Sequence, residues 1–167
     1  MTSKAVIPII SAALGATLVG GSCTPSKPNR LDALPTVDMT IKGQPFRLWV
    51  AESTKERDTG LMYITQEEMA PLANGTERGM IFVFDHSIRG SFWMKNTIIP
   101  LDIAYVATDG TVVTIHTMIP LDTRWGAYPP AKPYRYAIEV RAGRFQELSV
   151  KPGDVLDIPA GVLKDPS

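Results

Sequence analysis

The residues best suited to chemistry lie in one short segment, residues 92–97, with an acidic residue shortly after it. Trp93, Lys95 and Asn96 supply an indole, an ammonium group and an amide, and Asp102 supplies a carboxylate. Burying charge is costly unless the charge is paired and hydrogen-bonded, so an ordinary core strand does not need this polar set. We expect the segment to line a binding site for a small polar or anionic ligand, or for a segment of a partner protein.

Strand pairing would bring the lysine and the aspartate together. Successive side chains of a strand point to opposite faces of the sheet. We expect the strands through Met94 and Ile103 to pair antiparallel at these two residues. Lys95 and Asp102 then face each other across the strands and neutralise their charges beside Trp93. The alternative is a surface ion pair that contributes about 0 to 1 kcal/mol.

Two further charged residues, Arg57 and Glu139, are candidates for the same site. Arg57 falls in a predicted helix, and its guanidinium can make a planar, bidentate contact with a carboxylate of the protein or of a ligand. Glu139 is a lone carboxylate in an apolar strand. It either faces solvent or is the internal partner of Arg57 or Lys95.

Signatures of catalysis and of metal binding are mostly absent. His86 and His116 are far apart and have no Cys, Asp or Glu at metal-ligand spacing, so we expect neither a zinc site nor another metal or cofactor. The chain has no nucleophile elbow, no phosphate-binding glycine loop and no dinucleotide fingerprint. A non-enzymatic binding module is therefore our leading hypothesis.

An enzyme is the alternative hypothesis. It would be a hydrolase or transferase acting on cell-envelope material, with Asp102 or Glu139 as general acid or base and Lys95 or Asn96 stabilising developing charge. A third hypothesis gives the polar cluster only a packing role. A long proline-rich loop, residues 120–133, adds one more candidate surface: Trp125 and Tyr128, with Tyr134 just beyond, could form an aromatic rim for a carbohydrate or peptide.

The bulk composition indicates one globular domain with some additional sequence. The chain has 167 residues, of which 44% are hydrophobic and 20% are charged. Lysine plus arginine and aspartate plus glutamate number 17 each, so no overall field attracts nucleic acid, and we expect no nucleic-acid partner. The single cysteine, Cys23, excludes an internal disulfide.

The first 22 residues have the layout of a bacterial signal peptide. Lys4 precedes an apolar run, residues 5–19, and small residues follow up to Cys23. The run is short for a bilayer, which needs roughly 20 apolar residues. The cysteine after small residues resembles the lipobox of bacterial lipoproteins, with Gly20 where the pattern prefers leucine.

We therefore expect an exported domain of the cell envelope that is anchored to a membrane through a lipid on Cys23. Simple signal cleavage, which would give a soluble periplasmic or secreted protein, and a retained anchor are the alternatives. The proline-containing residues 23–35 predict a tether with a reach of roughly 20 Å. The folded part is expected to begin near Thr36.

Hydrophobic patterning predicts a small α+β domain with an antiparallel, strand-rich sheet that is barrel-like. Ser53 and Glu56 form a capping box before a helix at residues 54–62, and a second helical turn follows at residues 65–69. Apolar alternation and turn residues predict about eight short strands, with a loop at residues 85–90. The strands are expected at residues 37–41, 46–50, 79–84, 91–95, 101–106, 111–118, 136–141 and 155–158.

Six ordered motifs resemble the signatures of the DUF192 family over residues 36–158, leaving 159–167 as a C-terminal tail. They are Glu56-Arg57-x-x-Gly60-Leu61-Met62, Gly79-Met80-Ile81-Phe82-Val83-Phe84, Phe92-Trp93-Met94-Lys95-Asn96-Thr97, Pro100-Leu101-Asp102-Ile103, Glu139-x-x-x-Gly143 and Pro152-Gly153-Asp154. The family often carries an arginine where this chain has Ile64. The resemblance implies a small α+β domain, commonly exported or membrane-attached, and supplies no catalytic residues. Its signature positions here are Arg57, Met62, Trp93, Lys95, Asn96 and Asp102.

Overall fold

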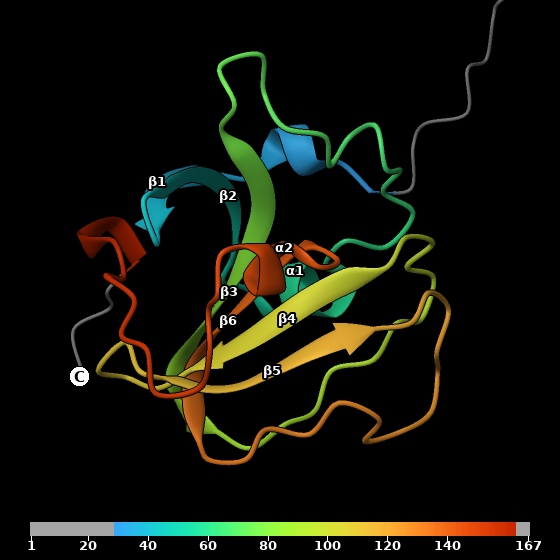
Figure 1. The fold of residues 1–167 in the computed structure, drawn as a ribbon. Helices are drawn as coiled ribbons and strands as arrows, with labels where there is room; N and C mark the ends of the chain where they lie inside the picture. The colour runs from blue at the N-terminus through green and yellow to red at the C-terminus, as the bar shows by residue number, and fades with distance from the viewer. Residues whose placement is uncertain (1–28, 163–167) are drawn as a thin grey trace, which may run out of the picture.

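The structure is a computed structural model that describes residues 29–162 (Figure 1). The predicted signal peptide, the predicted lipidation site at Cys23 and the end of the predicted tail lie outside the described residues. No helix in the described part of the chain has the length and apolar character needed to cross a bilayer.

Six strands form one open, mixed sheet in the order β1-β2-β3-β6-β4-β5. Only β2 and β3 run parallel, and every other neighbouring pair is antiparallel. The prediction of an antiparallel, barrel-like sheet is therefore corrected to an open sheet with one parallel pair, because the chain crosses over through α1 before β3 begins. The strands are β1 (Thr36–Ile41), β2 (Gln44–Ala51), β3 (Glu77–Ile88), β4 (Leu101–Val106), β5 (Val112–Met118) and β6 (Tyr134–Arg141).

Two short helices complete the α+β fold, α1 (Thr54–Thr59) and α2 (Arg144–Glu147). The predicted capping box is confirmed: the Ser53 hydroxyl accepts from the Glu56 amide, and the Glu56 carboxylate accepts from the Ser53 amide. The helix ends earlier than predicted, at Gly60, which has a φ of 47°. A side chain there would press on the Phe82 ring. Two 3₁₀ turns, η1 (Leu31–Ala33) and η2 (Ala160–Val162), flank the domain.

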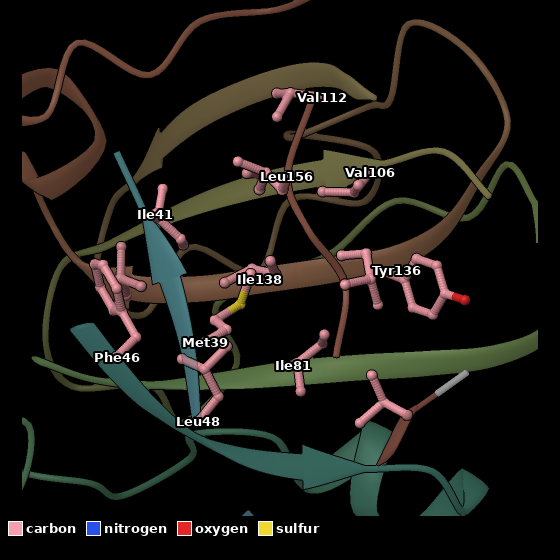
Figure 2. Close-up of a cluster of buried hydrophobic side chains, with 14 of the residues drawn as sticks. Met39, Ile41, Phe46, Leu48, Ile81, Val106, Val112, Tyr136, Ile138 and Leu156 are labelled. Carbon is pink, nitrogen blue, oxygen red and sulfur yellow. The ribbon is translucent and has the colours of Figure 1, made fainter. Parts of the chain in front are cut away.

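Apolar side chains cover both faces of the sheet. Figure 2 shows the first cluster, in which side chains of β1 and β2 point toward Ile81, Ile138 and Leu156. The second cluster lies on the opposite face and is built around Met80, Phe82 and Tyr105. Since β3 and β6 contribute to both clusters, burial on two faces explains why residues 79–84 read as a continuous apolar run.

Gly79 permits β3 to approach β6 closely. A Cβ at this position would collide with the Glu139 carbonyl oxygen and with the Leu48 side chain. The glycine is therefore needed for the backbone contact that fixes the place of Glu139.

Several local predictions are confirmed, and others are wrong. Residues 101–106 form β4 as predicted, and the hairpin of β1 and β2 turns at Lys42 and Gly43, both with positive φ. β3 continues to Ile88 through the predicted loop. Residues 155–158 do not form a strand, because only Val155 makes an isolated bridge, with Thr111.

Residues 91–95 are also not a strand. Phe92 makes one isolated bridge with Tyr128, and the chain then turns through Asn96, whose φ of 58° is left-handed. The Thr97 amide donates to the Met94 carbonyl across this turn. The aromatic and apolar composition predicted a strand, but no neighbouring strand is available to continue the pairing.

The folded part begins earlier than the predicted Thr36. Leu31 is buried in the second apolar cluster, and the Asn29 side chain is buried and donates to the Gly60 and Met62 carbonyls, at 2.9 Å each. Residues 29–34 therefore pack on the domain.

Candidate functional site

A small cavity opens beside the end of α1, and we refer to it as the Glu139 cavity. Its volume is about 30 Å³, which is room for one or two water-sized groups. It brings together five residues that the sequence nominated from three separate segments. Its lining residues are Arg57, Asp58, Thr59, Gly60, Leu61, Met62, Phe82, Phe92, Trp93, Lys95, Thr97 and Glu139.

Glu139 is the buried polar group of this cavity. It lies on β6 opposite Met80 of β3 and Ile103 of β4, and it is only 4% exposed. Among the described residues, no side chain or backbone group makes an ion pair or hydrogen bond with its carboxyl. Burial raises the pKa of Glu139 to about 8, so the protonated form of the carboxyl is favoured at pH 7. Neither predicted role, facing solvent or pairing with Arg57 or Lys95, is found.

The Arg57 guanidinium holds helix α1 against strand β3. Its Nη1 donates to the Val83 carbonyl at 3.0 Å and to the Glu52 carbonyl, and its Cζ lies 4.9 Å from the Phe84 ring centroid. These contacts occupy much of its hydrogen-bonding capacity. Arg57 therefore contributes mainly its positive charge to the cavity, because much of its capacity to donate hydrogen bonds is already used.

Trp93 and Lys95 form the outer rim of the cavity. The Lys95 Nζ lies 5.2 Å from the centroid of the Trp93 ring, a cation–π contact. Both side chains are exposed, where such a contact contributes about 0.5 to 1 kcal/mol. The ammonium group is exposed, so it can approach a ligand that enters the cavity.

The turn at Asn96 is held against the end of α1. The Asn96 carbonyl accepts from the Tyr63 amide at 2.8 Å, and its Nδ2 lies 3.8 Å from the Met62 sulfur. Tyr63 and Asn96 both have left-handed backbones, with φ of 61° and 58°. Because Asn29 also donates to the Met62 carbonyl, the first described residues support this wall of the site.

Asp102 does not belong to the site. It lies opposite Val140 in the sheet, whereas Glu139 lies opposite Ile103, so the two carboxyls point to opposite faces. Asp102 accepts from the Thr117 hydroxyl at 2.7 Å and from the Phe145 amide at 3.1 Å. It therefore ties β4 to β5 and to the start of α2.

The predicted cross-strand pair of Lys95 and Asp102 is wrong. Lys95 lies on a turn, because residues 91–95 pair with no strand. Asp102 is buried, with its hydrogen bonds made inside the sheet. The two charges are therefore not partners.

An aromatic layer behind the cavity was not predicted from the sequence. The ring centroids of Phe82 and Phe92 are 4.8 Å apart, and those of Phe92 and Tyr105 are 5.8 Å apart. The Tyr105 hydroxyl donates to the Tyr128 carbonyl at 2.6 Å and accepts from the Phe92 amide at 3.2 Å. Burial raises the pKa of Tyr105, which keeps its hydroxyl neutral. In the sequence, the only indication of this aromatic layer is that Phe92 lies next to Trp93.

The predicted aromatic rim of the proline-rich loop is mostly wrong. Trp125 is 89% exposed, but Tyr128 and Tyr134 are buried in the second apolar cluster. In the described part of the chain, no group of three or more His, Cys, Asp or Glu residues is arranged to hold a metal ion.

The sequence profile of the DUF192 family, described as an uncharacterized ACR, matches residues 37–158. No curated protein shows significant similarity to the chain.

Two solved structures are similar in sequence and in fold. One is from Sinorhizobium meliloti 1021 and is described as a candidate transcription regulator; it is 34% identical, with 73% of this chain and 90% of that chain covered and a TM-score of 0.61. The other, from Novosphingobium aromaticivorans DSM 12444, is a protein of unknown function; it is 32% identical, with 74% of this chain and 84% of that chain covered and the same TM-score, 0.61.

Proposed function

The chain belongs to the DUF192 family, described only as uncharacterized, and we propose that its domain is a non-enzymatic binding module for the anionic end group of a small polar ligand. One observation carries this proposal. The carboxyl of Glu139 is buried, unpaired by the described residues and exposed to a cavity that also touches Arg57 and Lys95. A polar group in that position is explained by a ligand that supplies the missing hydrogen bond.

The protonation state of Glu139 favours an anion over a cation. A neutral carboxyl donates a hydrogen bond, and an anionic oxygen is the strongest acceptor for it. Arg57 and Lys95 add positive charge, while Asp58, on the exposed side of α1, is the one acidic residue among the other lining residues. A carboxylate or phosphate oxygen therefore meets two cations and a donor.

The size of the cavity limits how much of the ligand can enter. About 30 Å³ admits a single end group and excludes a sugar ring. The remainder of the ligand would lie outside, over the Trp93 ring and beside Lys95. An indole face suits an apolar or planar ligand body.

We place this module in the cell envelope, anchored through a lipid on Cys23. Support comes from the sequence alone: the apolar run, the small residues and the single cysteine that follows them. Metabolic labelling of the full chain with a radioactive fatty acid tests the anchor. Label on the parent and none on Cys23→Ser is the expected result, and label on both or on neither contradicts it.

Titration of the full chain with acetate, inorganic phosphate and methylammonium tests the binding proposal. Shifts of the Trp93 indole signal in nuclear magnetic resonance spectra should saturate with the anions and not with methylammonium. Lys95→Met should weaken anion binding by about 1.5 to 3 kcal/mol, the range for hydrogen bonds to charged groups. Lys151→Met, at an exposed lysine outside the cavity lining, is the matched control. Equal anion affinity in both variants would remove Lys95 from the site.

A hydrolase or transferase with Asp102 and Glu139 as its acid–base pair is not supported by the arrangement of the two groups. Glycoside chemistry needs two carboxyls about 5 to 9 Å apart, flanking one bond, and these two point to opposite faces of the sheet. Nor do we carry over the regulator description of the S. meliloti protein. The chain's balance of 17 basic and 17 acidic residues offers nucleic acid no net attraction.

A further inference from the structure

Large apolar side chains are exposed beside the Glu139 cavity, and we call them the apolar patch. They lie on three turns, around residues 63, 93–98 and 119–125. Isolated exposed apolar residues are normal, but a contiguous group of large ones marks an interaction surface. The members, with their exposed fractions, are Tyr63 (40%), Trp93 (40%), Ile98 (47%), Ile119 (61%), Leu121 (58%) and Trp125 (89%).

Backbone hydrogen bonds join the three turns into one surface. The Leu121 amide donates to the Thr97 carbonyl at 3.0 Å, and the Met94 amide donates to the Asp122 carbonyl at 2.8 Å. The Tyr63 amide donates to the Asn96 carbonyl. The three turns therefore lie side by side, although 62 positions separate Tyr63 from Trp125 along the chain.

A left-handed backbone recurs on these turns. Tyr63, Asn96 and Leu121 have φ of 61°, 58° and 60°, a conformation that non-glycine residues seldom adopt. At Tyr63 and Leu121 this conformation accompanies a large exposed apolar side chain. Such local strain is often retained where the exposed group has a function.

On two of the three turns the charges have one predominant sign, whereas Glu67 and Glu68 follow Tyr63 on the third. The segments 89–100 and 119–133 carry the basic residues Arg89, Lys95, Arg124 and Lys132, and Asp122 is their one acidic residue. The Asp122 side chain is 7% exposed and is paired with Arg124 at 2.7 Å. Around these two turns the apolar patch is flanked by cations, which suits a surface of anionic lipid headgroups.

The position of Asn29, the first described residue, indicates the same surface. Asn29 donates to the carbonyl of Met62, the residue before Tyr63 of the patch. Six peptide links separate Asn29 from Cys23, so a lipid on Cys23 would hold Asn29 within about 20 Å of the bilayer. This step rests on the lipid anchor in the proposed function. The anchored domain would then present the apolar patch to the membrane.

We propose that the apolar patch docks onto a phospholipid bilayer that contains anionic lipid. Trp93 and Trp125 lie at the interface between headgroups and acyl chains, where indoles are favoured, and Ile98, Ile119 and Leu121 reach the upper acyl chains. Lys95 and Arg124 contact lipid phosphates. The Glu139 cavity consequently opens beside the membrane surface.

Fluorescence quenching by lipid tests this docking. The full chain is reconstituted with vesicles of phosphatidylcholine and phosphatidylglycerol that carry bromine on the acyl chains, which quenches nearby indoles. One variant keeps only Trp125 (Trp49→Phe with Trp93→Phe), and a control keeps only Trp49 of strand β2 (Trp93→Phe with Trp125→Phe). Trp125 should lose most of its emission, and Trp49 should keep its own.

Ile119→Ser with Leu121→Ser, made in the variant that keeps only Trp125, should restore the emission of Trp125. Val155→Ser, at another exposed apolar residue, should not restore it.

Vesicle flotation separates this inference from the anchor on which it rests. A chain that floats with the vesicles but shows unquenched Trp125 keeps the anchor, overturns docking on lipid and leaves the patch to a protein partner. A chain that does not float overturns both the anchor and the docking. Quenching that is unchanged in the serine double variant also overturns the assignment of the patch.

Discussion

Glu139 on strand β6 lies directly opposite Ile103 on strand β4, so its carboxyl is packed among apolar side chains. Burial among these side chains raises the pKa of Glu139.

The stability of the protein should fall as the pH rises from about 4.5 to about 8. The pKa of Glu139 is raised from an ordinary 4.5 to about 8 in the folded state, so the folded state retains a proton that the unfolded state releases. Stability is therefore lost through this window by roughly 1.4 kcal/mol per pH unit and is level above it. Urea unfolding of the parent and Glu139→Gln should give curves that diverge across the window, with the glutamine variant relatively more stable toward pH 8. Parallel curves would show that Glu139 titrates normally.

Binding of small anions should weaken above pH 8. The anion requires the protonated Glu139 as a donor, so the association constant should fall about tenfold per pH unit above the pKa of the free protein. Arg57, Asp58, Lys95 and Tyr105 also face or adjoin this carboxyl. These four groups are the same in the parent and in Glu139→Gln, so they affect the pH dependence of anion binding equally in both proteins.

Calorimetric titration with acetate measures this effect. In Glu139→Gln, which cannot ionise, acetate affinity should lose most of this pH dependence while binding persists. A parent whose affinity is level between pH 7 and pH 9 would contradict the role of Glu139 as a donor to the ligand.

Asp102→Ala should destabilise the fold by about 2 to 4 kcal/mol without changing anion affinity at temperatures where the variant is folded. The substitution leaves the Phe145 amide, which is buried, and the Thr117 hydroxyl without their acceptor. Thermal unfolding measures the loss, and Asp102→Asn, which keeps one acceptor oxygen, should recover part of it. Loss of anion binding in well-folded Asp102→Asn would instead place this residue in the site.

Asn29→Ala should release residues 29–34 from the domain. The side chain makes two hydrogen bonds, to the Gly60 and Met62 carbonyls, and their loss should cost about 1 to 2 kcal/mol locally. Limited digestion with trypsin should then cut after Arg30 faster than in the parent. Asn74→Ala, which removes only a local turn contact with the Thr76 amide, is the control and should leave that rate unchanged.

Features encoded by neighbouring residues could be predicted from the sequence. The capping box of Ser53 and Glu56 depends on a few adjacent positions. The sequence likewise indicated residues 92–97, because their polar groups had no role in an ordinary strand, and Trp93 and Lys95 form the rim of the Glu139 cavity. Arg57, Met62 and Glu139 then meet that rim in the structure.

Features that depend on distant partners could not be predicted. Whether residues 91–95 pair as a strand depends on a neighbour that the fold does not supply. The face taken by Asp102 depends on the register of β4 with β6, and the burial of Asn29 depends on the end of α1. Neither the protonation of Glu139 nor its lack of a partner has a local signal, since both follow from packing across the sheet.

Strand β6 joins two halves of the sheet that are completed well before it in the sequence. Strands β1 to β3 form one half and β4 with β5 the other, and only residues 134–141 pair with both. A chain emerging from the ribosome therefore cannot complete the sheet until residues 134–141 have been made. Until then the two halves expose the apolar surfaces that β6 later covers.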